Sequence, residues 1–262
     1  MKLAANLGFL YQDQILAARV QAAAGDGFDG VECPFPYALP AADCAQALQA
    51  AGLPLVLINT PLGAGGEPGL AAVPGRQADF RSGLQCALDY AHRTACPRVH
   101  VMAGRPGPQG LDTGLLEANL HWAADLAQDA GVTLLLEPLN RADMPGYAYH
   151  QPAQALALIQ RLARPQLRLQ FDLYHVRREG LDPLAALHSA RDWIHHVQIA
   201  EAPRRSAPEP GRADTAAALR LVGALPHVGW LGLEYHPDGD TSAGLAWLPA
   251  LRLALADQEV VA

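Results

Sequence analysis

The chain has 262 residues, of which 50% are hydrophobic, and its formal net charge is -7 at pH 7. This length is typical of one (β/α)8 barrel, and the apolar content can fill a large core. The negative charge argues against binding nucleic acid by charge alone, and no apolar run approaches the ~18 residues of a membrane span. We therefore expect one soluble enzyme domain over residues 1–262, with neither nucleic acid nor a membrane as partner.

Eight short apolar runs alternate with amphipathic stretches along the chain. The spacing of Leu116, Leu120 and Ala123 is typical of one face of a helix. Asp182 followed by Pro183 indicates a capped helix start. Strict alternation predicts a parallel sheet covered by helices, and eight strands close it into a (β/α)8 TIM barrel. The strands are expected at 2–6, 30–32, 53–59, 98–102, 133–137, 167–172, 194–198 and 230–234.

The connections that follow the expected strands are longer than those that precede them. Segments 60–76, 103–111 and 200–213 follow strands and are rich in Gly and Pro. In a barrel this is the face that carries the active site. Segment 60–76 exceeds the usual loop length, so it is either a lid over the site or a disordered surface loop.

Two rare residue types restrict the chemistry. Lys2 is the only lysine, and it lies where the first strand begins, at the end opposite a barrel active site. Schiff-base chemistry needs a desolvated lysine amine and is nearly excluded, so a carbonyl must be activated by a metal or by hydrogen-bond donors. The cysteines show no C-x-x-C pair, which indicates four reduced thiols in a cytoplasmic protein.

The last four expected strands each end on a residue that can bind a hard cation. These residues are Glu137, Asp172, Gln198 and Glu234. Because the carboxyl ends of parallel strands meet at one face, we expect a metal site there. An all-oxygen set suits Mg²⁺ or Mn²⁺ rather than zinc or copper. One such glutamate alone could equally be a helix cap or a solvated loop residue, and Gln198 is the weakest ligand because an amide is neutral.

The sequence around these four residues resembles the hydroxypyruvate isomerase family, within the xylose-isomerase-like barrels. The motifs are Glu137-Pro-Leu-Asn140, Phe171-Asp-Leu-Tyr-His175, His196-Val-Gln-Ile-Ala200 and Glu234-Tyr-His-Pro237, with further likeness in 27–37, 66–72 and 241–247. The resemblance covers essentially the whole chain. It implies a divalent metal and a reversible conversion of hydroxypyruvate to tartronate semialdehyde, a reaction of glyoxylate metabolism.

The expected chemistry fits these residues independently. Moving a carbonyl between adjacent carbons requires removal of a carbon-bound proton and stabilisation of an enediolate. A metal bound by both substrate oxygens can stabilise the negative charge of the enediolate. In related barrels the two metal-binding glutamates transfer the proton, and Glu137 and Glu234 match those positions. Which of the two acts first is left open.

The resemblance also implies substrate contacts. His175 matches a histidine that contacts substrate oxygens in related ketose epimerases; the alternative is a packing histidine. Arg204 lies six residues after Gln198, where the related epimerases also carry a substrate-contacting arginine, and its guanidinium fork could hold a carboxylate. Glu67 is either a group that closes over the substrate or an exposed loop charge. His196 is expected to point inward as a residue of the barrel core.

The segment after Gln198 departs from the family pattern. The family carries a histidine, a Glu-Pro and a Gly-Glu there, whereas this chain has Ser206 and Arg212 at or near the histidine and the glutamate. In that register Arg205 rather than Arg204 takes the arginine position. The two arginines therefore have to be tested side by side.

Three alternatives remain open. A ketose 3-epimerase or a 2-oxo-tetronate isomerase would use the same metal and glutamates. An endonuclease-IV-like repair enzyme would need further metal ligands and a basic DNA-binding face, which the charge disfavours. A binding module that has lost catalysis would be expected to lose a ligand. Phosphorylated substrates are disfavoured by Asp238 and Asp240 near the usual phosphate loops, and homo-oligomerisation is left open.

Overall fold

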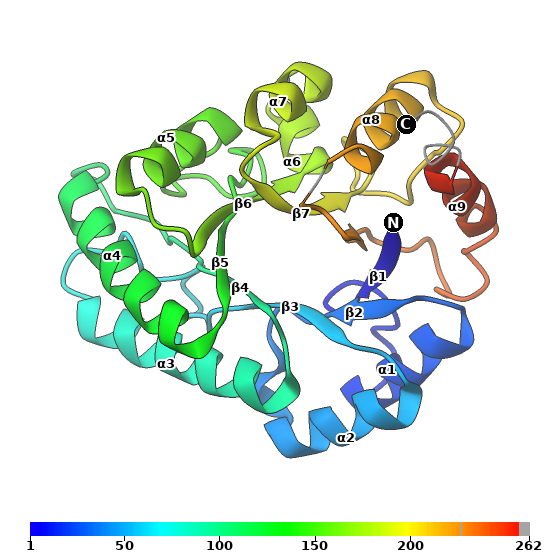
Figure 1. Cartoon of the computed structure of the whole chain (residues 1–262), viewed down its shortest axis with the longest axis horizontal. Helices are drawn as coiled ribbons and strands as arrows, with labels where there is room; N and C mark the ends of the chain where they lie inside the picture. Colours follow the sequence, from blue (N-terminus) through cyan, green and yellow to red (C-terminus); the bar gives the residue numbers. More distant parts are fainter. Residues whose placement is uncertain (226, 257–262) are drawn as a thin grey trace.

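The computed structural model describes residues 1–225 and 227–256. Eight parallel strands form a closed barrel in the order β1 to β8, with helices around the outside (Figure 1). The predicted (β/α)8 fold is confirmed. The strands are β1 (Lys2–Asn6), β2 (Gly30–Glu32), β3 (Leu55–Asn59), β4 (Arg98–His100), β5 (Thr133–Leu136), β6 (Leu167–Asp172), β7 (Ile194–Ile199) and β8 (Trp230–Leu233).

The helices cover the barrel in chain order, and their predicted start signals are present. Asp182 accepts hydrogen bonds from the backbone of Leu184 and Ala185, with Pro183 in the first turn. The described helices are α1 (Leu16–Gly25), the 3-10 helix η1 (Pro36–Ala38), α2 (Ala41–Ala51), α3 (Gln77–Thr94), α4 (Thr113–Ala130), α5 (Pro152–Leu162), α6 (Leu173–Arg178), α7 (Pro183–Ala190), α8 (Ala213–Gly223) and α9 (Leu248–Ala256).

Strand boundaries differ from the prediction by one or two residues at several ends. β3 begins at Leu55 because the Leu53 backbone N–H bonds the Leu48 carbonyl and so belongs to the end of α2. β4 ends at His100, where the prediction continued to Met102, whose N–H is taken by the Thr60 hydroxyl instead. These differences leave the residues at the carboxyl ends of the strands in place.

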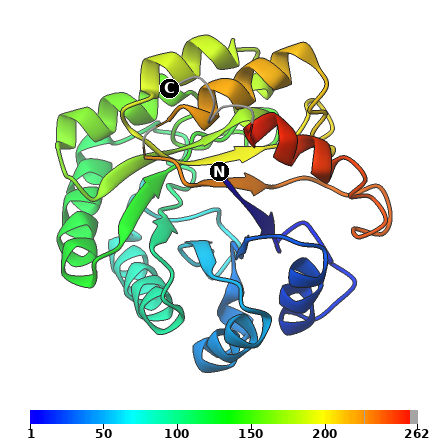
Figure 2. The ribbon, with the colours of Figure 1, turned by 45° about the vertical axis from the view of Figure 1, so that its right-hand side comes forward.

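Strand register brings the polar strand ends to one level. Asn6 pairs with Glu32, Asn59 with His100, and Asp172 with Gln198. Figure 2 shows β7 and β8 side by side, with β1 against β8 closing the barrel. The side chains of most strand residues are fully buried, as a barrel filled by side chains requires.

The second half of segment 60–76 is neither a free lid nor a disordered loop. The N–H of Ala72 donates to the carbonyl of Ala103 at 2.7 Å, and the Asn119 amide donates to the Ala71 carbonyl at 2.8 Å. Gly69 has φ +93°, and a Cβ there would lie 2.1 Å from the Met102 carbonyl oxygen, so the close approach of the segment to the end of β4 requires glycine. The segment is part of the barrel wall.

Two smaller sequence observations can be compared with the structure. All four cysteines are free in the structure, and Cys33, Cys44 and Cys96 are buried. Within the described residues, no helix has the length and apolar character needed to cross a bilayer.

Candidate active site

The carboxyl end of every strand supplies one polar side chain to the same face of the barrel. Six of the eight are almost completely buried, with exposed fractions of 5% or less. Successive side chains of a strand point to opposite faces, so one residue at each strand end can be directed at the barrel axis. In order from β1 to β8 they are Asn6, Glu32, Asn59, His100, Glu137, Asp172, Gln198 and Glu234.

A cluster of two carboxylates and one imidazole lies at the ends of β5 and β6. Ligand atoms of Glu137, Asp172 and His175 all lie within 4.8 Å of one another. Glu137 Oε1 is buried and has no hydrogen-bond partner among the described residues. Burial, followed by the charges of Glu234 and Asp172, raises the pKa of Glu137 well above its ordinary value. A buried cluster of acidic oxygens with an unused acceptor fits a divalent cation.

The hydrogen bonds of His175 decide what its ring can do. The backbone N–H and the side-chain amide of Asn140 approach its Nδ1 at 3.1 and 2.7 Å. Nδ1 therefore accepts, and the proton of the neutral ring is on Nε2, which lies 3.7 Å from Asp172 Oδ2 and 3.9 Å from Glu137 Oε1. Burial lowers the pKa of His175 well below its ordinary value. In this tautomer His175 is a hydrogen-bond donor at the cluster.

Gln198 and Glu234 lie on the next two strands, β7 and β8, in a network of amides. Gln198 Nε2 donates to Glu32 Oε2 at 2.7 Å and also to Glu234 Oε2. Asn6 Nδ2 donates to the same two carboxylates, at 2.8 and 3.0 Å. Gln198 Oε1 accepts from Gln170 at 2.7 Å, which leaves one lone pair of this oxygen for a further partner.

Glu32, which belongs to this network, also contacts His196. His196 Nε2 is 2.5 Å from Glu32 Oε1, and both side chains are fully buried, as expected for an inward-pointing His196. A Cβ on Gly232 would lie 1.9 Å from Glu32 Oε1. The glycine of β8 therefore leaves the space that the Glu32 carboxylate fills.

Arg205 joins the two halves of the site. Its Nη2 lies 3.1 Å from Asp172 Oδ2 and 2.8 Å from Glu234 Oε1, and its Nε donates to the Glu234 carbonyl. The rings of Phe9 and Tyr174 cover the guanidinium at 4.5 and 4.8 Å. Only Nη1 remains for a substrate, so Arg205 can offer one nitrogen and not a fork.

The structure does not bring Arg204 or Glu67 to this cluster. Arg204 is exposed and faces a separate surface cavity between the loops that follow β7 and β8. Glu67 pairs with Arg76 of its own segment at 2.5 Å and accepts from the Gly65 backbone. Arg205 therefore has the position that we expected of Arg204, and Glu67 is tied to the wall segment instead of facing the cavity.

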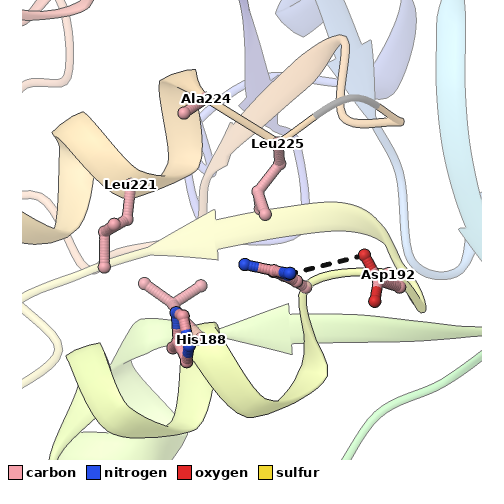
Figure 3. A pocket seen from close by; sticks show the side chains of 7 residues that line it. His188, Asp192, Leu221, Ala224 and Leu225 are labelled. Carbon is pink, nitrogen blue, oxygen red and sulfur yellow. Dashed lines mark ion pairs between the residues drawn. The ribbon is translucent and has the colours of Figure 1, made fainter.

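A cavity of about 380 Å³ opens above the carboxylates. Glu137, Glu234, His175 and Arg205 contribute its polar lining, and its apolar wall is made of Phe9, Phe35, Met102, Leu139 and Met144. This volume suits a small molecule. A second cavity, of about 340 Å³, lies between the carboxyl ends of α7 and α8, lined by His188, Leu221 and Leu225 (Figure 3). Helices run opposite to the strands, so this second cavity is at the far end of the barrel from the strand-end residues.

Sequence reasoning missed the polar residues of the first four strands. Asn6, Glu32 and Asn59 end expected strands, as the four predicted ligands do, so the same criterion of position identifies them. His100 is not identified in this way, because the strand expected at 98–102 continued to Met102. The hydrogen bonds of Asn6 with Glu234, and of Glu32 with His196 and Gln198, could not be read from the sequence, because they join strands far apart in the chain.

The comparisons with known proteins agree with the barrel fold. The family model described as xylose isomerase-like TIM barrel matches residues 20–251. A structure described as AP endonuclease, family 2, from Brucella melitensis has a TM-score of 0.89 and 36% identity, covering 95% of this chain and 98% of its own. An L-ribulose 3-epimerase has a TM-score of 0.79 at 21% identity, covering 100% and 97%, which shows a shared fold.

Curated relatives match over nearly their whole length. A putative hydroxypyruvate isomerase of Homo sapiens is 41% identical, with 95% of this chain and 94% of the relative covered. A 2-oxo-tetronate isomerase of Cupriavidus necator is 40% identical, with 94% and 97% covered. The hydroxypyruvate isomerase of Escherichia coli is 33% identical, with 96% and 100% covered. The chain belongs to the hydroxypyruvate isomerase family of xylose isomerase-like TIM barrels.

Proposed function

We propose that the protein is a metal-dependent isomerase that interconverts hydroxypyruvate and tartronate semialdehyde, or the matching pair of a longer hydroxy-oxo acid. The observation that carries the proposal is the placement of Glu137 and Glu234 on two sides of one small cavity, with Asp172 beside Glu137 and Arg205 between Asp172 and Glu234. An isomerisation that moves a proton between neighbouring carbons needs two such groups facing one substrate.

A divalent cation, Mg²⁺ or Mn²⁺, completes the proposed site. Glu137, Asp172, Gln198 and Glu234 would hold it, and its chemistry is to stabilise negative charge that develops on the substrate oxygens. The unpartnered Glu137 Oε1 and the raised pKa of Asp172, caused first by burial, support this assignment. The first is a buried acidic oxygen that the described residues do not satisfy, and the second shows that burial disfavours the charged form of a neighbouring carboxyl.

The residues of this chain perform the proton transfer in the proposal. One of Glu137 and Glu234 takes the proton from carbon, and the other glutamate donates a proton to the neighbouring carbon. The hydroxyl proton moves between the two substrate oxygens, so the net reaction is an isomerisation. Burial raises the pKa of Glu234 to about 8, which suits a carboxyl that must both accept and release a proton near neutral pH. His175 Nε2–H and Arg205 Nη1 would donate hydrogen bonds to substrate oxygens, and the apolar wall around them limits access of water.

The direct test is a substrate panel with Mg²⁺ and with Mn²⁺. We expect turnover of three- or four-carbon hydroxy-oxo acids, complete loss after EDTA treatment, and recovery when metal is returned. A reaction in D₂O followed by NMR should place deuterium on the carbon that gains a proton. Full activity in metal-free protein would contradict the proposed site.

Two features bear on the competing functions. Relatives named for hydroxypyruvate and for 2-oxo-tetronate are 41% and 40% identical to this chain, so sequence identity does not distinguish a three-carbon from a four-carbon substrate. DNA repair receives no support from charge, because the chain carries -7 and one lysine. We also propose a cytoplasmic location, because four free thiols fit a reducing compartment.

A further inference from the structure

His100 is a buried polar side chain for which the described residues provide no hydrogen bond. It is 1% exposed and lines the cavity at the end of β4, and neither ring nitrogen has a partner. Nδ1 lies 3.2 Å from Glu137 Oε2, but not in a direction that forms a hydrogen bond. A buried imidazole without a partner is costly, so a ligand in the cavity is expected to satisfy it.

Asn59 lies beside His100 with an amide that is almost unused. The two residues are paired in register at the ends of β3 and β4. The Asn59 backbone is fixed, because its N–H donates to the Pro34 carbonyl at 2.9 Å and its carbonyl accepts from the Tyr37 hydroxyl. Its side-chain Nδ2 meets only the sulfur of Met102, at 3.9 Å, which is a weak acceptor.

This pair lies across the barrel from Arg205 and Glu234. β3 and β4 are opposite β7 and β8 in a closed barrel of eight strands, and all four side chains line the same cavity. A substrate whose reacting carbons lie between Glu137 and Glu234 therefore extends one end toward Arg205 and the other toward Asn59 and His100.

The chemistry of the pair suits a hydroxyl group. A neutral imidazole offers one donor and one acceptor, as an amide also does. A hydroxyl can use both. A second carboxylate is unfavourable here because Glu137 Oε2 is 3.2 Å from the ring. Apolar side chains of Phe35 and Met102 line the same part of the cavity and limit competing water.

We propose that Asn59 and His100 form a hydroxyl-binding subsite that recognises the terminal hydroxymethyl group of a four-carbon 2-oxo acid. The inference rests on the proposed isomerase function and specifies its substrate. In 2-oxo-tetronate, carbons 2 and 3 exchange the carbonyl, the carboxylate is at one end, and the carbon 4 hydroxyl is at the other. Hydroxypyruvate lacks this fourth carbon and would leave the subsite without a partner.

The test compares kcat/KM on 2-oxo-tetronate and on hydroxypyruvate for wild type, Asn59→Leu and His100→Phe. A site built to hydrogen-bond a hydroxyl discriminates strongly against a substrate without it. We expect the wild type to prefer the four-carbon acid, and we expect that preference to fall by roughly tenfold or more in Asn59→Leu. His100→Gln keeps a donor and an acceptor and should retain more of the preference than His100→Phe.

His188→Phe is the matched control, because it makes the same exchange as His100→Phe in the cavity at the far end of the barrel, away from the strand-end residues. Its ratio of the two kcat/KM values should equal that of wild type. Equal losses on both substrates in Asn59→Leu, or a wild-type preference for hydroxypyruvate, would overturn the subsite. If wild type converts neither acid, the proposed function fails, and calorimetric binding of the two acids to metal-loaded wild type and Asn59→Leu still decides the subsite: equal affinities for the four-carbon acid would refute it.

Discussion

Glu137 and Glu234 have different surroundings, although both end a strand of the same barrel. Among the described residues Glu137 Oε1 has no hydrogen-bond partner, whereas Glu234 is bonded by Arg205, Asn6 and Gln198. Glu137→Gln and Glu234→Gln keep an oxygen but remove the proton acceptor. Each should lower kcat by ~100-fold or more and retain part of the metal affinity measured by calorimetry.

Each of the two variants tests the role of its own glutamate. Wild-type kcat in either variant would remove that glutamate from the proton-transfer pair. Loss of metal binding together with kcat would show that the residue acts mainly as a ligand.

Arg204 and Arg205 are neighbours in sequence with very different environments. Arg205 contacts Asp172 and Glu234, whereas Arg204 is exposed. Arg205→Met leaves two carboxylates without their shared cation, and charge-assisted hydrogen bonds of this kind are worth about 1.5–3 kcal/mol. We expect kcat/KM to fall by roughly 30-fold or more in Arg205→Met and to stay within about twofold of wild type in Arg204→Met. The reverse order would return the substrate contact to Arg204.

The residues that sequence alone could identify are those placed by strand periodicity. Glu137, Asp172, Gln198 and Glu234 end successive strands, so their common face follows from the parallel barrel. The position of Arg205 does not follow, because it depends on φ +56° at that residue and on the mutual hydrogen bonds between Glu201 and Ser206. Adjacent loop residues can point in opposite directions, and no periodicity distinguishes them.

At the level of elements, the β7–α8 loop is held by a buried ion cluster. Glu201 is 2% exposed, and Oε2 lies 3.0 Å from both Arg177 Nη1 and Arg212 Nη1. Its Oε1 accepts from the Thr215 hydroxyl at 2.7 Å. The cluster joins α6, the loop and the start of α8. It therefore fixes the loop that presents Arg205.

Removing the charge of Glu201 should affect stability and the site together. Glu201→Gln leaves the buried Arg177 with only the more distant carboxylate of Asp214, at 3.5 Å, and breaking a buried pair is strongly destabilising. We expect the free energy of unfolding to fall by about 2–4 kcal/mol in denaturant titrations, with a several-fold loss of kcat/KM. Glu209→Gln is the matched control, because this exposed glutamate of the same loop contacts the cluster only through its backbone N–H. Equal stability of the two variants would contradict a structural role for the cluster.

The segment that follows β3 shows what loop length can and cannot predict. Length and Gly content predicted that segment 60–76 lies outside the helices and strands, and the structure confirms this. The docking of Ala72 on Ala103 was not predictable, because it depends on a long-range backbone contact that only Gly69 allows. A Gly in a long loop thus marked a close approach of two chain segments.

For the molecule as a whole, closing the barrel gathers several acidic groups in one buried place. Burial raises the pKa values of Glu137, Asp172 and Glu234. A carboxyl with a raised folded pKa holds its proton more tightly in the native than in the unfolded state. Its contribution to stability is therefore present below the unfolded pKa of about 4 and is lost as pH rises toward the folded pKa. Without metal, the charged forms of these buried carboxyls therefore destabilise the native barrel at neutral pH.

The thermal stability of metal-free protein should accordingly fall between about pH 7 and about pH 8, the range that ends near the pKa of Glu234. Buried His100, His175 and His195 have lowered pKa values and act in the opposite direction only below about pH 6.5, so this range is free of their effect. Mg²⁺ or Mn²⁺ binds the native state and should raise Tm more at the higher pH, because more of the carboxylates are then charged. Scanning calorimetry of EDTA-treated and metal-loaded protein measures both effects. The double variant Glu137→Gln, Glu234→Gln should show a weaker dependence on pH, and a metal-free Tm that rises over this range would show that the acidic cluster does not destabilise the barrel.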